Sequence, residues 1–140
     1  MLIALIGYGE VGRILAEDLA PQGHSVAAYD IKLHGRGGDV LREHAAQHGI
    51  ALAHAHASAV QDAELVISAV TASQAVPVAE GIAPGLAKGA YVLDFNSASP
   101  GAKIRAGAIV NAAGGRYVEG AVMTSIPPYE RPVNMMFQSY

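Results

Sequence analysis

Short apolar runs alternate along the chain with longer segments in which apolar residues recur at helical spacing. Most of the short runs are continuously apolar, which is typical of strands that are covered on both faces. Their alternation with helical segments predicts βαβ units and a parallel sheet. The predicted strands are Leu2–Ile6, His24–Tyr29, Ile50–Ala53, Leu65–Val70, Tyr91–Phe95 and Tyr117–Val122, the weakest pattern being that of Ile50–Ala53.

The helical segments are bounded by proline, glycine and a capping residue. Their periodicity predicts helices over Val11–Leu19, Asp39–His48, Ser73–Leu86 and Pro100–Ala113. Because Pro77 lacks a backbone N–H, it is tolerated only in a first turn, so the third helix should begin near Ser73 or Gln74. Ser99 is expected to cap the fourth helix, with Pro100 at its first position. Strand and helix thus alternate, which predicts a doubly wound α/β domain.

Length and composition narrow the class of protein. At 140 residues the chain suffices for one ordinary domain, predicted over residues 1–140. With 51% hydrophobic and 15% charged residues, it is predicted to be globular. A formal net charge of −3, with few and scattered basic residues, argues against a nucleic-acid partner. The absence of cysteine leaves no disulfide framework and fits a cytoplasmic protein.

No membrane segment is expected. The longest charge-free apolar run, Leu65–Ala79, is interrupted by polar residues and by Pro77, and it is shorter than the roughly 20 apolar residues of a spanning helix. The opening MLIALIGYG has no basic leader and no small-residue cleavage site. We therefore expect a first strand there rather than a signal peptide.

Three glycines, in the sequence GYGEVG, follow the first predicted strand and open the first predicted helix. In a dinucleotide-binding turn, Gly7 would allow the tight bend, Gly9 the approach of backbone to a pyrophosphate, and Gly12 close packing of helix on strand. The helix N-terminus would add free N–H groups and a partial positive charge. The segment predicted to bind the pyrophosphate is Gly7, Tyr8, Gly9, Glu10, Val11 and Gly12.

An acidic residue, Asp30, ends the second predicted strand, eighteen residues beyond Gly12. A carboxylate there can accept hydrogen bonds from the adenine-side ribose of NAD and would repel the 2′-phosphate of NADP. Lys32, His34 and Arg36 follow closely and could instead receive that phosphate. NAD is thus the favoured cofactor, with NADP left open. The competing interpretation is a plain strand-to-helix turn and a surface aspartate.

A Rossmann-type domain typically begins with a strand, a glycine turn and a helix, followed by a second strand that ends in an acidic residue, and the same order is found here. We therefore predict a mostly parallel sheet with strand order 3-2-1-4-5-6. The tail VNMMFQSY is expected to add an edge strand near the C-terminus. Its Met135, Met136 and Phe137 would then be exposed as an interface.

The segment DFNSASPGAKIRAGAI, residues 94–109, resembles the substrate-binding segment D-x-S-T-x-S-P of the β-hydroxyacid dehydrogenases. That group includes 3-hydroxyisobutyrate and 6-phosphogluconate dehydrogenases, and the similarity runs from Leu2 to about Met136. The resemblance implies that a small hydroxyacid substrate contacts Asn96, Ser97 and Ala98. It also implies that Val70 and Thr71 line the nicotinamide ribose.

A second similarity to the family is YVEGAVMTSIPPY, which corresponds to F-V-D-A-P-V-S-G-G. Here Met123, Thr124 and Ser125 stand where the family has serine and two glycines. The following IPPYERP, residues 126–132, is expected to be a rigid connection.

The resemblance covers the first half of a family member. In the family, a C-terminal helical domain supplies a G-x-x-x-K lysine as general acid/base and most of the dimer interface; we expect this domain to be absent here. Lys32, Lys88 and Lys103 stand in no such motif, and Lys103 is expected to be a solvated helix lysine. The chain is therefore expected to bind dinucleotide with little or no turnover. Its expected protein partners are further copies of the same chain, in a homo-oligomer, or the missing C-terminal domain. The alternatives are a stand-alone dinucleotide-binding or regulatory module, and an imine- or ketopantoate-type reductase domain.

The six histidines are expected to be exposed, and no metal site is predicted. His44 and His48 are four residues apart on a predicted helix, a spacing at which two imidazoles can share a metal. However, no third ligand is evident from the sequence. His54 and His56 are expected on a solvated extended segment, and Glu17 on the solvated face of the first helix.

Overall fold

The computed structural model describes residues 1–122 and 135–139, with side chains for residues 1–120. The elements alternate as the sequence predicts. In chain order they are β1 Leu2–Ile6, α1 Glu10–Leu19, η1 Ala20–Gln22, β2 Ser25–Tyr29, η2 Ile31–His34, α2 Gly38–His48, β3 Ala51–Leu52, α3 His56–Ala59, β4 Leu65–Ser68, η3 Ala72–Gln74, α4 Ala75–Ile82, η4 Ala83–Gly85, β5 Tyr91–Asp94, α5 Pro100–Ala112, β6 Arg116–Val122 and β7 Met135–Ser139, where η marks a 3-10 helix.

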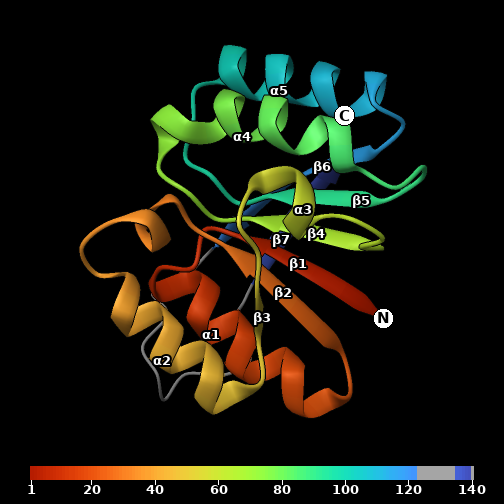
Figure 1. Ribbon diagram of the computed structural model, residues 1–140. Helices are drawn as coiled ribbons and strands as arrows, with labels where there is room; N and C mark the ends of the chain where they lie inside the picture. The colour runs from red at the N-terminus through yellow and green to blue at the C-terminus, as the bar shows by residue number, and fades with distance from the viewer. Residues whose placement is uncertain (123–134, 140) are drawn as a thin grey trace.

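One twisted sheet forms the middle layer, with strand order β3-β2-β1-β4-β5-β6-β7. The first six strands are parallel, and β7 runs antiparallel to β6 at the edge. Helices α1 and α2 cover one face, and α4 and α5 cover the other (Figure 1). The predicted doubly wound Rossmann-type fold, its order 3-2-1-4-5-6 and its extra edge strand are confirmed.

Strand β1 lies in the interior of the sheet, between β2 and β4, and is buried on both faces. Ile3, Leu5 and Ile6 are each 1% exposed, although alternate residues of a strand point to opposite faces. Both faces are therefore covered, which explains why the strand is a continuous apolar run rather than an alternating one. None of the helices in the described part of the chain has the length and apolar composition needed to cross a membrane.

The proline positions explain where the helices begin and end. Pro77 is the third residue of α4, within its first turn as predicted. Pro84 lacks an N–H and would clash with the carbonyl four residues earlier, so the predicted helix Ser73–Leu86 is divided and Pro84 lies in η4. Ser99 caps α5, its hydroxyl accepting a hydrogen bond from the N–H of Ala102 at 3.2 Å.

A buried charged network lies beneath the carboxyl end of β5. Lys103 on α5 and Asp94 at the end of β5 are each 2% exposed, so the expectation of a solvated Lys103 is wrong. The Lys103 ammonium lies 3.2 Å from the Asp94 carboxylate and 3.9 Å from that of Glu119. The Tyr117 hydroxyl donates to the other Asp94 oxygen at 2.5 Å. The burial arises because α5 packs against α4 and β6 and directs Lys103 to the end of β5, which a helical periodicity does not reveal.

Replacing Lys103 with methionine should destabilise the fold strongly. The Lys103→Met variant keeps the side-chain length but leaves the Asp94 carboxylate buried without its cation, which costs about 3 kcal/mol. Urea unfolding followed by circular dichroism measures the loss. Lys88→Met, at an exposed lysine, is the matched control and should change the free energy of unfolding by less than about 0.5 kcal/mol. Equal losses in the two variants would contradict the role given to this network.

Candidate functional site

The turn between β1 and α1 brings the backbone of three elements into contact. Gly7 has a φ of +95°, and its N–H donates to the carbonyl of Tyr29 at the end of β2, at 2.9 Å. A Cβ on Gly7 would lie 2.3 Å from the carbonyl oxygen of Ala69, just after β4, and one on Gly12 would lie 2.1 Å from the Gly7 oxygen. Both positions therefore require glycine, and α1 starts directly against the end of β1.

Gly9, in contrast, faces open space. A Cβ there would meet nothing within 4 Å, and the backbone is extended in a region that any residue can adopt. Gly9 is the N-cap of α1, so the first N–H groups of the helix, at Glu10, Val11 and Gly12, have no intrahelical acceptor. A bare backbone beside a helix N-terminus suits the approach of a phosphate group.

Asp30 lies directly beside this turn. One of its carboxylate oxygens accepts from the N–H of Tyr8 at 2.8 Å, and the other from the N–H of Lys32 at 2.9 Å. The side chain is thus held at the end of β2 while each oxygen keeps a further lone pair for an outside donor. The predicted turn residues and Asp30 are therefore brought together, as the sequence order suggests.

Two cavities lie along the carboxyl edge of the sheet. The first, of about 240 Å³, is lined by Gly7, Gly9 and Asp30, among others. The second, of about 360 Å³, lies between Val11 of α1 and the segment after β5. Residues 69–71 line both cavities, so Val70 and Thr71 stand where the two adjoin.

Asn96 points inward rather than into a cavity. It is 5% exposed, its side-chain oxygen accepts from the N–H of Val70 at 2.6 Å, and its amide donates to the hydroxyl of Ser68 at 3.2 Å. The residue therefore ties the loop after β5 to the end of β4. In this arrangement Asn96 is a positioning residue for Val70, and its contact with a substrate stays a prediction.

The other two predicted substrate residues differ in exposure. Ser97 is exposed and lines the second cavity together with Phe95. Ala98 is partly buried and is not among the residues lining that cavity. Ser97 is thus the polar side chain that this loop presents to the cavity. The family segment at Met123, Thr124 and Ser125, and the connection over residues 126–132, lie outside the described residues.

His56 lines the first cavity, which the sequence analysis missed. It opens the short helix α3 instead of lying on a solvated extended segment, and its ring packs edge-on against Tyr29 at 4.7 Å between centroids. Gly81 of α4 leaves room for it, since a Cβ there would lie 2.8 Å from Nδ1 of His56. Burial lowers the pKa of His56 below its usual 6.5, and the Asp30 carboxylate opposes this shift. The signal in the sequence that could have indicated His56 is its position shortly after the weak third strand.

The expectation that all six histidines are exposed is also wrong for His44. Its ring lies between α1 and α2, where Nε2 lies 2.9 Å from the Glu17 carboxylate and Nδ1 lies 2.5 Å from the Tyr8 hydroxyl. Glu17 is accordingly a hydrogen-bond partner and not a freely solvated acid. The contact depends on how α1 packs against α2, which their separate periodicities do not specify.

His56 should make the stability of the fold depend on pH. Because its pKa is lowered in the folded state, the unfolded chain binds this proton more readily, and stability is lost as the pH falls through the unfolded pKa of about 6.5. The variant His56→Gln should show a smaller fall over this range, measured by urea unfolding at each pH. His54→Gln, at an exposed neighbour, should keep the wild-type dependence. An unchanged pH dependence in His56→Gln would contradict the assignment.

Solved structures of similar fold extend over about twice the length of this chain. A conserved hypothetical protein from Sinorhizobium meliloti 1021 is 32% identical, with a TM-score of 0.89 over 98% of this chain and 46% of that one. A Mycobacterium tuberculosis 3-hydroxyisobutyrate dehydrogenase, determined with L-serine, is 21% identical, with a TM-score of 0.77 over 88% of this chain and 40% of that one. An imine reductase from Myxococcus stipitatus, in complex with NADP⁺, is 20% identical, with a TM-score of 0.72 over 89% of this chain and 42% of that one. The last two likenesses show the fold alone.

The sequence itself matches one protein family over most of its length. Residues 2–125 match the NAD binding domain of 6-phosphogluconate dehydrogenase. No curated protein matches the sequence. The resemblance inferred from the glycine turn and the loop after β5 is confirmed by this match. The chain therefore belongs to the family of the NAD binding domain of 6-phosphogluconate dehydrogenase.

Proposed function

We propose that the chain binds NAD along the carboxyl edge of its sheet, as the cofactor domain of a hydroxyacid oxidoreductase. The pyrophosphate would lie at Gly9 and the N-terminus of α1, the adenine-side ribose at Asp30, and the nicotinamide end at Thr71. The open backbone at Gly9, beside two positions that admit no Cβ, is the observation that carries the proposal. Any bulkier residue at these three positions would block either the turn or the approach of a phosphate.

The preference for NAD over NADP rests on Asp30. Its carboxylate is fixed by the N–H groups of Tyr8 and Lys32, so it cannot turn away from a ribose 2′-phosphate without losing both bonds. Lys32 and Arg36 are exposed beyond Asp30 and favour the rival cofactor, as does the NADP⁺ held by the imine reductase of similar fold. The charge close to the 2′ position of the adenine-side ribose decides between NAD and NADP. Asp30 is therefore the residue to test.

The substrate side would be the second cavity, with Ser97 as its polar wall. A bound nicotinamide would supply hydride exchange, and the chain's part is to position it between Val11 and the loop after β5. The Lys103 ammonium is held against Asp94 in the interior, so it does not serve as the base for an alcohol proton. We propose a small hydroxyacid as substrate, on the D-x-N-S-x-S-P segment, with the proton-transfer group supplied from outside the described residues.

A binding or regulatory module without catalysis is the second candidate. It is favoured by the second cavity, because no ionisable side chain is among the described residues that line it. A domain that only senses dinucleotide would need the first cavity and the glycine turn, and both are formed here. An imine-reducing domain is a further alternative that uses the same cofactor edge.

Removing the charge of Asp30 should weaken the discrimination between the two cofactors. The variant Asp30→Asn keeps the side-chain oxygen but abolishes a repulsion of about 1–4 kcal/mol with the 2′-phosphate. We expect the preference for NAD over NADP to fall by about tenfold, measured by calorimetric titration with each cofactor. Asp39→Asn removes the same charge from an exposed site on α2 and should leave the preference unchanged. Failure of the folded wild-type chain to bind either cofactor would refute the proposed function.

The two glycines should respond to alanine in opposite ways. Gly9→Ala should fold normally, because its Cβ meets nothing within 4 Å, but should bind NAD at least about tenfold more weakly by obstructing the phosphate. Gly12→Ala should be destabilised by about 3 kcal/mol or more, since its Cβ would lie 2.1 Å from a carbonyl oxygen. Thermal melting and NAD titration separate the two effects. Wild-type binding by Gly9→Ala would place the pyrophosphate elsewhere.

A further inference from the structure

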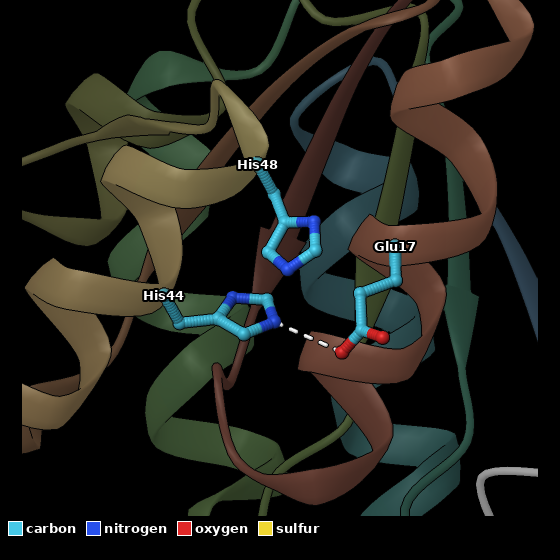
Figure 2. A group of neighbouring side chains, drawn as sticks. All are labelled: Glu17, His44 and His48. Carbon is cyan, nitrogen blue, oxygen red and sulfur yellow. Dashed lines mark hydrogen bonds and ion pairs between the residues drawn. The ribbon is translucent and has the colours of Figure 1, made fainter.

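We propose that Glu17, His44 and His48 form a binding site for a divalent transition-metal ion of the zinc class. The site joins α1 to α2 on the face of the sheet opposite α4 and α5 (Figure 1). The three side chains point toward one another across the gap between these helices (Figure 2). One ligand atom from each lies within 4.8 Å of the others. Glu17 is the third ligand that the sequence did not reveal, so the expectation of no metal site gives way to this proposal.

The donor set suits zinc chemically. Two imidazole nitrogens and one carboxylate oxygen are a combination that zinc uses with a fourth position open to water. His44 and His48 are one turn apart on α2, with ring centroids 4.4 Å apart, so both rings face α1. Imidazole is a poor ligand for magnesium, which prefers oxygen, and this predicts selectivity for the transition metal.

His44 is already oriented for this role. Its Nδ1 is held by the hydroxyl of Tyr8, a fully buried side chain at the bend of the glycine turn. A partner on one ring nitrogen fixes the plane of the ring and leaves the other, Nε2, facing Glu17.

Small side-chain movements are enough to close the site. The ligand atoms of a tetrahedral zinc lie about 3.3–3.6 Å apart, given Zn–N and Zn–O bonds of about 2.0–2.2 Å. His44 Nε2 and the Glu17 oxygen lie 2.9 Å apart, and the largest separation in the group is at most 4.8 Å. No hydrogen bond to any residue in the described part of the chain holds the His48 ring, so its rotation can make up the difference.

A bound metal ion explains the position of the His48 ring, which the pairing of His44 with Glu17 alone does not explain. The His44–Glu17 contact is satisfied without His48, yet the His48 ring lies against that of His44, with 4.4 Å between the ring centroids. The Glu17 side chain is 36% exposed and that of His44 is 14% exposed, so the cluster is open to solvent on one side. An ion can therefore enter without unfolding either helix.

Calorimetric titration of the 140-residue chain with zinc chloride tests the site, using protein that carries no histidine tag. We expect one zinc per chain and no comparable binding of magnesium chloride. His48→Gln should weaken zinc binding at least about tenfold, since even loss of a residue that only supports a ligand costs this much. His54→Gln, at an exposed histidine outside the cluster, is the matched control and should bind as the wild type does.

A second variant, Glu17→Gln, keeps the test decisive if His48→Gln is poorly folded, and it should show a similar loss. Circular dichroism confirms that each variant is folded before titration. Zinc binding that is lost in His48→Gln and Glu17→Gln but retained in His54→Gln supports the proposal. No zinc binding by the folded wild type, equal binding by the variants of the cluster, or equal binding of magnesium would overturn it.

Discussion

The close approach of backbone at Gly7 is the constraint on which the rest of this structure depends. At this residue the interior strand β1 ends, and its neighbours β2 and β4 and the helix α1 all come within contact distance. A side chain at Gly12 would push α1 away from the end of β1, and one at Gly7 would clash with the backbone that follows β4. The same contact aims the N-terminus of α1 at the open space beside Gly9, where a phosphate can be held. Packing and proposed binding therefore have a common physical origin.

The second feature that shapes the site is the set of polar bonds along the carboxyl edge of the sheet. Asp30 fastens the glycine turn to the end of β2, and Asn96 fastens the loop after β5 to Val70. Beneath that loop, Asp94 is held by Lys103 and Tyr117. These groups satisfy each other in the interior, where an unpaired polar group is costly. Their effect is to hold Val70 and Ser97 at the second cavity without themselves entering it.

The cluster of Glu17, His44 and His48 is connected to the glycine turn through one residue. Tyr8 links the two regions, since its N–H donates to Asp30 and its hydroxyl meets His44. An ion bound between α1 and α2 would thus lie one side chain from the proposed cofactor site. Tyr8 therefore contributes to both the proposed cofactor site and the proposed metal site, although its position between Gly7 and Gly9 indicates only the cofactor site.

The sequence by itself determined the strands, their order and the glycine turn with its acid, because continuous apolar runs, helical periodicity and a required glycine are local signals. Local signals also placed Pro77 in a first turn and Ser99 at a cap. Only the tertiary structure decided that Lys103 is buried, that Asn96 points inward, that His56 lines the first cavity and that Glu17 meets two histidines. Each of these depends on the distance and rotation between elements far apart in the chain, which packing sets and no residue pattern within a single element encodes.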